Sequence, residues 1–168
     1  MGCAYHNSKA YCWYDDNSSY KDTYGALYTW EAAMNGAVSS TSSPSGVQGA
    51  CPTGWHLPSY AEWTTLEIYL GGSSIAGGKM KETGTEHWLF PNTGATNESG
   101  FTALPGGCRY DQSGSFNFLS SRGTWWSSSQ TRSNTDAADY LMIFSNVGSS
   151  IGGNNEKNCG FSVRCLKD

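Results

Sequence analysis

The sequence predicts an α+β fold that is rich in loops, with short antiparallel strands outnumbering the helices. Charged and aromatic residues each make up 14% of the chain and 21 of its 168 residues are glycine, which is typical of a loop-rich sheet protein rather than a helical bundle. Helix signals are confined to two segments, whereas short apolar runs alternate with turn residues beyond position 72. The length fits one domain, so we expect a single domain over residues 1–168.

Two segments in the first half carry helix signals. In YGALYTWEAAMNGA we expect a strand at 27–28 and then a short helix, which Thr29 caps and Asn35 ends together with the following glycine. In the second segment, Ser59 and Glu62 have the spacing of a capping box, in which the two side chains satisfy two unpaired amide donors. This spacing predicts a helix that two glycines end after position 70.

The rest of the chain predicts strands joined by long loops. The polar, glycine-rich segments 111–123, 129–138 and 145–158 are predicted to be exposed loops. The apolar runs are predicted to be strands of an antiparallel sheet, at 101–105, 124–128, 139–144 and 161–166.

Charge and hydropathy exclude two classes of partner. The net charge is −4 and no Lys/Arg cluster occurs, so we expect no nucleic-acid binding. No run approaches the roughly 18 apolar residues that a membrane-spanning helix needs, so we expect no membrane span. The amino terminus lacks a basic and apolar signal region, so we expect a mature form without a signal peptide.

Six cysteines, at positions 3, 12, 51, 108, 159 and 165, suggest an oxidising compartment. They include no C-x-x-C pair and no histidine at zinc-site spacing, so we expect three disulfides, for which fifteen pairings exist. The alternative is buried thiols in a cytosolic protein.

Several segments, taken in order, resemble the Fibrobacter succinogenes major paralogous domain family of secreted and surface proteins. They are 24–30, 51–72, 77–88, 92–107, 125–129 and 160–165. HLPSYAEW and the terminal GFSVRC are also similar to segments of formylglycine-generating enzymes and phage receptor-binding proteins. The resemblance implies a branch of the C-type lectin-like fold, with two helices flanking small antiparallel sheets, disulfide staples and binding loops on one face.

The resemblance also guides the choice of disulfides. Cys108 and Cys159 stand where the family has other residues, and their joint presence supports a pair between them. Family members often have a second cysteine near Tyr20 to partner the one at position 12, and Cys3 takes that role here. We therefore predict the disulfides Cys51–Cys165, Cys108–Cys159 and Cys3–Cys12.

We expect no catalytic residues and no enzymatic activity. The formylglycine-generating enzymes oxidise with a close cysteine pair upstream of their terminal motif, and residues 109–158 contain no cysteine. The three histidines have no spacing that suggests a triad or a metal site; they are His6, His56 and His87.

We expect no cofactor, and the metal content is left open. The calcium motifs of sugar-binding C-type lectins are replaced here by Phe90-Pro91-Asn92 and Trp126-Ser127-Ser128, which disfavours that sugar mechanism. A structural calcium ion stays an alternative, with oxygen ligands from Asn92, Asn97, Glu98 or the pair Asp15-Asp16.

The segment 110–158, which we call the loop face, mixes aromatic, arginine and amide side chains, a composition typical of recognition surfaces. Strand alternation allows only one of Trp125 and Trp126 to face the core. We assign Trp125, Leu141 and Ile143 inward and Trp126, Tyr140 and Met142 to the loop face, with the opposite phase left open. The predicted ligand-binding residues are Tyr110, Arg122, Trp126, Gln130, Arg132, Asp139, Tyr140 and Asn146.

These features predict a bacterial ligand-binding or adhesion domain, secreted or displayed on the cell surface, that binds a glycan or a protein receptor through the loop face. A structural or assembly module of a larger surface protein or fibre is the alternative, and an oxidase of the formylglycine-generating type is a third interpretation. The sequence does not specify the oligomeric state.

Overall fold

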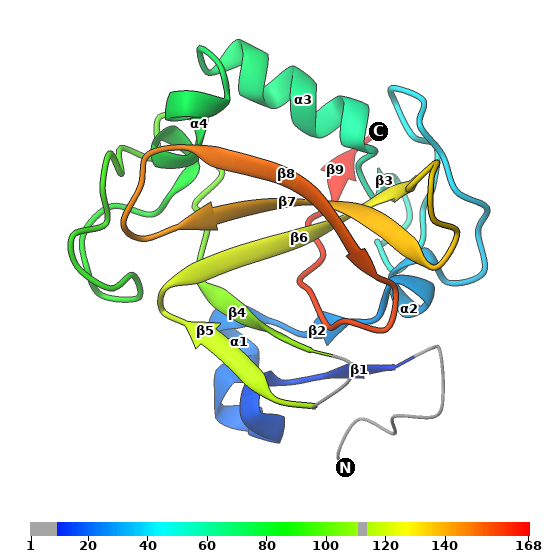
Figure 1. Ribbon diagram of the computed structural model, residues 1–168, viewed down its shortest axis with the longest axis horizontal. Coiled ribbons are helices and arrows are strands. Elements are labelled where there is room, and N and C mark those ends of the chain that lie inside the picture. The colour runs from blue at the N-terminus through cyan, green and yellow to red at the C-terminus, as the bar shows by residue number, and fades with distance from the viewer. Residues whose placement is uncertain (1–9, 111–113) are drawn as a thin grey trace.

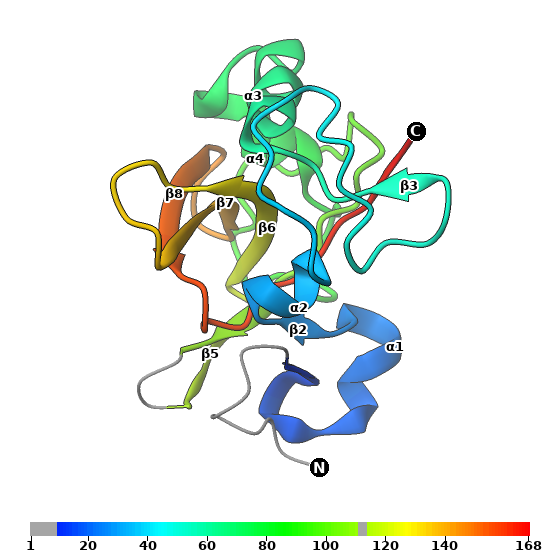
Figure 2. The same cartoon turned by 90° about the vertical axis from the view of Figure 1, so that its right-hand side faces the viewer.

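The computed structural model describes residues 10–110 and 114–168 and centres on a three-stranded antiparallel sheet. Its strands are β6 (Arg122–Gln130), β7 (Ala137–Phe144) and β8 (Ser150–Glu156), in the order β6-β7-β8. Helices α3 (Tyr60–Tyr69) and α4 (Ser73–Met80) lie on one side of this sheet (Figure 1). Figure 2 shows α1 (Lys21–Tyr24) and α2 (Trp30–Met34) on the opposite side.

Three two-stranded antiparallel pairs complete the sheets, which confirms an α+β fold with small antiparallel sheets. They are β1 (Tyr11–Cys12) with β2 (Leu27–Tyr28), β3 (Trp55–His56) with β9 (Leu166–Lys167), and β4 (Gly106–Arg109) with β5 (Phe116–Leu119). Two short 3₁₀ turns, Tyr14–Asp16 and Ser18–Tyr20, precede α1. In the described part of the chain, no helix is long and apolar enough to cross a membrane.

The two predicted helices begin where their caps predict. The Thr29 hydroxyl accepts a hydrogen bond from the amide of Ala32 at the start of α2, and Asn35 ends that helix in the left-handed conformation. Ser59 and Glu62 form the reciprocal capping box of α3. Local hydrogen bonding of these side chains therefore sets both helix starts.

Helix α4 is absent from the sequence-based prediction because its composition, SSIAGGKM, is poor in helix-forming residues. Two of its glycines lie against other backbone segments. A Cβ atom on Gly77 would approach the carbonyl oxygen of Ser149 at 2.2 Å, and one on Gly78 would approach that of Gly94 at 2.3 Å. The glycines thus allow α4 to pack closely, at the expense of the intrinsic helix propensity that the sequence-based prediction relied on.

The strand predictions are right for two of the four apolar runs, whereas the other two runs form little regular strand. The runs at 124–128 and 139–144 lie within β6 and β7. The run at 101–105 contains only an isolated bridge at Ala103, and the run at 161–166 contains isolated bridges before β9. The sequence predicts exposed loops at 145–158 and 111–123, but β8 and all of β5 lie there.

The sequence does not predict strand β8, because glycines interrupt its apolar pattern. The backbone of Gly152 lies against the hydroxyl of Tyr60 from α3, while Gly153 lies against the ring of Tyr140 on the other face of the sheet. Each glycine leaves room for one tyrosine, so the sequence GG here marks close packing rather than a turn.

Both tryptophans of β6 are buried, which corrects the assignment of Trp126 to an exposed loop face. Trp125 packs with Leu141 and Ile143 in a core beneath α3 and α4, as predicted for these three residues. Trp126 points the opposite way into a second core, where its ring centre lies 4.3 Å from that of Phe161. Strand β6 thus separates two cores, and alternation directs each ring into one of them instead of directing one to solvent.

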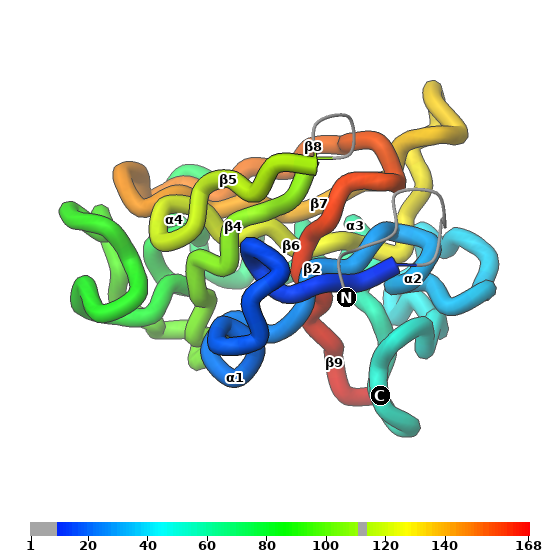
Figure 3. Tube along the Cα trace, turned by 90° about the horizontal axis from the view of Figure 1, so that it is seen from below, coloured from blue at the N-terminus to red at the C-terminus, as the bar shows by residue number. Residues whose placement is uncertain are grey.

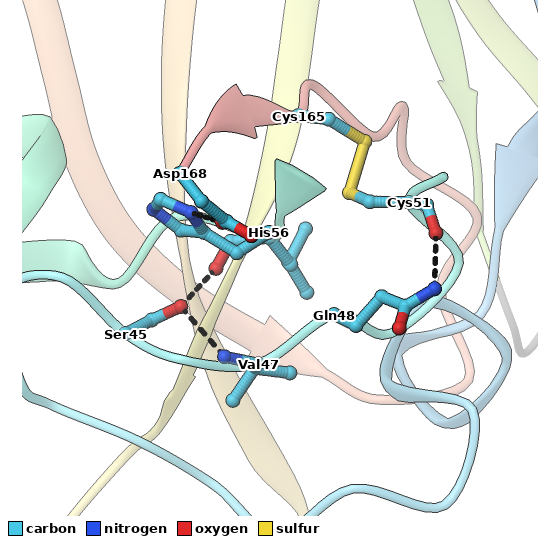
Figure 4. Close-up of a disulfide and its surroundings, with 8 residues drawn as sticks. Ser45, Val47, Gln48, Cys51, His56, Cys165 and Asp168 are labelled. Carbon is cyan, nitrogen blue, oxygen red and sulfur yellow. Dashed lines mark hydrogen bonds and ion pairs between the residues drawn. A yellow bond between two sulfur atoms is a disulfide. The ribbon is translucent and has the colours of Figure 1, made fainter. Parts of the chain in front are cut away.

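The predicted Cys51–Cys165 disulfide is present and joins the segment before α3 to the residue that precedes the last strand, β9 (Figure 4). Beside it, the two ring nitrogens of His56 contact a carboxylate oxygen of Glu62 at 2.9 Å and one of Asp168 at 2.7 Å. Burial lowers the pKa of His56, but the hydrogen bonds to both carboxylates outweigh this effect, and the net pKa is raised.

The other predicted disulfides are not found among the described residues. Arg109 forms an isolated antiparallel bridge with Gly160, which places Cys108 and Cys159 in neighbouring segments. Cys108 is a buried thiol, which corrects the predicted pair with Cys159. Cys3 lies outside the described residues, and with it the predicted pair with Cys12.

Candidate ligand-binding surface

The side chain of Arg122, the first residue of β6, is the centre of the candidate site. Only 7% of its surface is exposed. Its Nη2 donates a hydrogen bond to the Sγ of Cys108, and its Nη1 lies 3.4 Å from the hydroxyl of Tyr110. The guanidinium carbon lies 4.2 Å from the centre of the Phe118 ring, a cation–π contact. The hairpin of β4 and β5 therefore covers this cation with a thiol and two aromatic rings.

This guanidinium has no acidic partner among the described residues. No Asp or Glu oxygen of those residues lies within 4.0 Å of it, and its Nε is buried without a hydrogen-bond acceptor. A buried charge without an anion is costly, and the two rings offset only part of the lost hydration. Burial raises the pKa of the Cys108 thiol although Arg122 opposes this shift, so the sulfur is uncharged at neutral pH.

Tyr140 extends the site along the sheet. It is half-buried, its ring centre lies 5.4 Å from that of Phe161, and it pairs with Gly153 of β8. Burial raises the pKa of its hydroxyl, and the nearby charge of Arg122 opposes this shift. The hydroxyl of Tyr140 is therefore a neutral hydrogen-bonding group.

Apolar side chains continue the same surface toward the edge of the sheet. Met142 lies two residues from Tyr140, hence on the same face, and pairs with Ile151. Phe118 and Ile151 are 43% and 41% exposed. We call this surface the arginine face and define it as Tyr110, Phe118, Arg122, Tyr140, Met142 and Ile151.

The structure thus brings together three of the predicted ligand-binding residues, namely Tyr110, Arg122 and Tyr140. Trp126 lies beneath them in the core and cannot contact a ligand on the surface. Ile151 was missed because its strand has no alternating apolar pattern in the sequence. Phe118 belongs to the aromatic mixture of the loop face, but nothing in the sequence predicts that it stacks on Arg122.

The remaining predicted residues lie elsewhere. At the far end of β6, the side-chain oxygen of Gln130 accepts a hydrogen bond of 2.8 Å from Lys157. Asp139 accepts one of 2.9 Å from Thr131, and burial raises its pKa although this bond opposes the shift. Arg132 and Asn146 are exposed in the loops before and after β7. These four residues do not form one site with Arg122.

Among the oxygen ligands suggested for calcium, those of Asn97 and Glu98 have other partners, whereas the buried Oδ1 of Asn92 has no hydrogen-bond partner. The amide nitrogen of Asn92 donates to the carbonyls of Glu82 and Gly84, and Asn97 exchanges hydrogen bonds with Thr102. Glu98 forms an ion pair with Lys79, and Asp15 and Asp16 lie in an exposed turn. Among the residues described, no group of three or more His, Cys, Asp or Glu side chains could hold a metal ion.

No curated protein and no solved structure matches the chain. A family model described as the Fibrobacter succinogenes major domain matches residues 2–167, which is nearly the whole sequence. The motifs on either side of the Cys51–Cys165 disulfide and the strands that carry the arginine face all lie within this match. The chain therefore belongs to the bacterial Fibrobacter succinogenes major domain family.

Proposed function

We propose that the protein is a non-enzymatic ligand-binding or adhesion domain, secreted or displayed on the bacterial surface, and that the arginine face binds its ligand. The observation that carries this proposal is the desolvated guanidinium of Arg122, held between aromatic rings without an acidic partner among the described residues. Tyr110 and Tyr140, which are partly exposed beside this buried cation, are of a residue type that contributes strongly to the energy of recognition sites.

The ligand is a glycan or a protein receptor. The exposed ring of Phe118 and the partly exposed ring of Tyr140 offer apolar area at little entropic cost, and the two tyrosine hydroxyls offer hydrogen bonds. Sugar rings and protein side chains both present apolar faces edged with polar groups. The arginine face suits either class, and the experiment below separates them.

Two further features support this proposal. The Cys51–Cys165 disulfide is of a kind that persists in oxidising compartments, which favours a location outside the cytoplasm. The disulfide, the pairing of β3 with the last strand β9 and the helices α2 and α3 beside small sheets are also expected of a C-type lectin-like fold. We propose that the domain is a branch of that fold, which is used widely for recognition.

A glycan array probed with the whole domain tests the proposal. The wild type should bind, whereas Phe118→Ala and Tyr140→Ala should bind at least about tenfold more weakly, the loss expected when a recognition ring is removed. Tyr69→Ala is the matched control, because Tyr69 is an exposed aromatic residue on the helical side of the molecule. It should bind like the wild type.

Other outcomes discriminate among the interpretations. If no glycan binds, the ligand is not a carbohydrate. A purified surface protein that then binds the wild type but not Phe118→Ala would identify a protein receptor as the ligand. If neither class binds and the domain self-associates with rising concentration in a Phe118-dependent way, the face serves assembly instead. Equal ligand binding by all variants would reject the arginine face as the binding site.

A further inference from the structure

A pocket of about 360 Å³ lies between the segment that joins α1 to β2 and the C-terminal segment that leads to β9. These two segments run side by side, with Tyr28 bridged to Phe161 (Figure 3). Aromatic side chains line the pocket, including Tyr24, Phe101 and Trp125. None of the lining residues belongs to the arginine face, so the pocket is a separate feature of the molecule.

Arg164 is the one charged side chain among the described residues that line this pocket. Its guanidinium carbon lies 4.5 Å from the centre of the Phe101 ring. Within the described ranges, no Asp or Glu oxygen lies within 4.0 Å of it. Burial lowers the pKa of Arg164, but the guanidinium keeps its charge at neutral pH. Arg164 is an exposed residue, so the pocket presents a cation that no carboxylate of the described residues neutralises.

The chemistry of the lining suits a small acidic ring. A guanidinium pairs with a carboxylate through two parallel hydrogen bonds, a geometry that favours planar anions. The partly exposed ring of Tyr24 suits the apolar face of a sugar ring, and the hydroxyls of Thr23, Thr102 and Ser162 suit its hydroxyl groups. The volume is at the lower end of the range for ligand pockets, roughly 300–1,000 Å³, and favours a single ring.

We propose that this pocket binds a hexuronate, the acidic sugar unit of many polysaccharides, with its carboxylate on the guanidinium of Arg164. The proposal does not depend on the arginine face, because the two sites share no residue. A failure of either one leaves the other standing.

Titration of the ¹⁵N-labelled domain with D-glucuronic acid, followed by NMR, tests the proposal. A single sugar ring should bind with a dissociation constant of about 1 mM, as expected for so small a ligand. Saturable shifts should appear at the Trp125 indole and at amides of 23–26, 102–104 and 162–165. The methyl ester of glucuronic acid lacks the charge, and glucose lacks the carboxylate, so both should bind at least about tenfold more weakly.

Variants then assign the carboxylate contact. Arg164→Gln should weaken glucuronate binding at least about tenfold and Arg164→Lys less, because lysine keeps the charge but not the paired hydrogen bonds. Arg132→Gln is the matched control, since Arg132 is an exposed arginine in the loop before β7. It should leave binding unchanged. If Arg164→Gln does not fold, the affinities of the wild type for glucuronic acid and for its methyl ester still show whether the carboxylate is recognised.

Three results would overturn the proposal. The first is the absence of saturable shifts at tens of millimolar glucuronate, and the second is equal binding of the acid and its ester. The third is benzoate binding at the same residues as tightly as glucuronate, which would identify a general pocket for aromatic acids rather than a sugar site.

Discussion

The ammonium nitrogen of Lys81 lies 2.8 Å from the carbonyl oxygen of Thr93, although the side chain of Lys81 is completely buried. The same nitrogen donates to the carbonyls of Phe144 and Val147, both at 3.0 Å, and lies 5.5 Å from the centre of the Trp88 ring. Burial lowers the pKa of Lys81 to about 8. One cation thus ties the end of α4 to the loop around Thr93 and to the turn between β7 and β8.

Replacing Lys81 with methionine should destabilise the fold. Methionine has a similar volume but no donor, so several buried carbonyls would lose their partner, at a cost of about 3 kcal/mol. For a chain of this length, the melting temperature should fall by roughly 10 °C. Lys79→Met is the control, since Lys79 lies in the last turn of α4, in an ion pair with the exposed Glu98, and its replacement should change stability by less than about 1 kcal/mol. A Lys81→Met protein as stable as the wild type would contradict this role.

The glycines of α4 lead to a second prediction. Alanine normally stabilises a helix relative to glycine by about 1 kcal/mol. At Gly77 the added Cβ would meet the carbonyl oxygen of Ser149 at 2.2 Å, so Gly77→Ala should destabilise the protein by about 1–3 kcal/mol instead. Ser74→Ala, at an exposed position of the same helix, should be neutral or slightly stabilising in the same urea titrations. If Gly77→Ala and Ser74→Ala changed the free energy of unfolding by the same amount, α4 would not pack as closely as described.

The disulfide is expected to be a major source of stability. Cys51 and Cys165 are 114 residues apart, and closing so long a loop should stabilise the fold by about 4–5 kcal/mol in the chain-entropy model. The double variant Cys51→Ser/Cys165→Ser should therefore melt roughly 10–15 °C lower. Reducing the wild type should lower its melting temperature by a similar amount and leave that of the double variant unchanged. A reductant that lowers both melting temperatures equally would show that another disulfide is responsible.

His56 should make stability depend on pH. Its net pKa is raised by two carboxylates, one at each ring nitrogen, so the folded state holds the proton more tightly than the unfolded chain. The resulting stability is fully present below the unfolded pKa of about 6.5 and is lost as the pH rises through the higher folded pKa. Above it, the neutral ring has only one donor for its two acceptors.

Melting temperatures of the wild type and His56→Gln between pH 5 and 9 test this prediction. The difference in melting temperature between the two proteins should be largest at low pH and should decrease as the pH rises. Asp168→Asn removes one of the two partners and should reduce the pH dependence without abolishing it. If the melting temperatures of the wild type and His56→Gln changed in parallel with pH, His56 would not be the source of the pH dependence.

Features set by neighbouring residues were predictable from the sequence. Thr29 and Ser59 cap helices through hydrogen bonds that span three residues, so their roles can be read directly from spacing. The apolar runs in β6 and β7 predict strands for the same reason. The Cys51–Cys165 pair is distant in sequence, and the resemblance to a known family made it predictable.

Features that depend on distant packing were not predictable. Gly77 and Gly152 weaken local patterns, and only the segments that pack against them explain why a helix and a strand form there. The burial of Trp126 could not be foreseen, because alternation shows that two neighbouring side chains point apart but not whether both sides are covered. Likewise, the contact between Arg122 and Phe118 depends on how the β4–β5 hairpin folds over β6.

Hydrogen exchange of the domain, alone and saturated with the ligand that the array or receptor screen identifies, tests the central claim most directly. If the arginine face binds the ligand, protection should appear at backbone amides of 116–119 and 150–153, which carry Phe118 and Ile151, and should be absent from helix α3. Protection confined to α3, or to segments without any residue of the arginine face, would contradict the account.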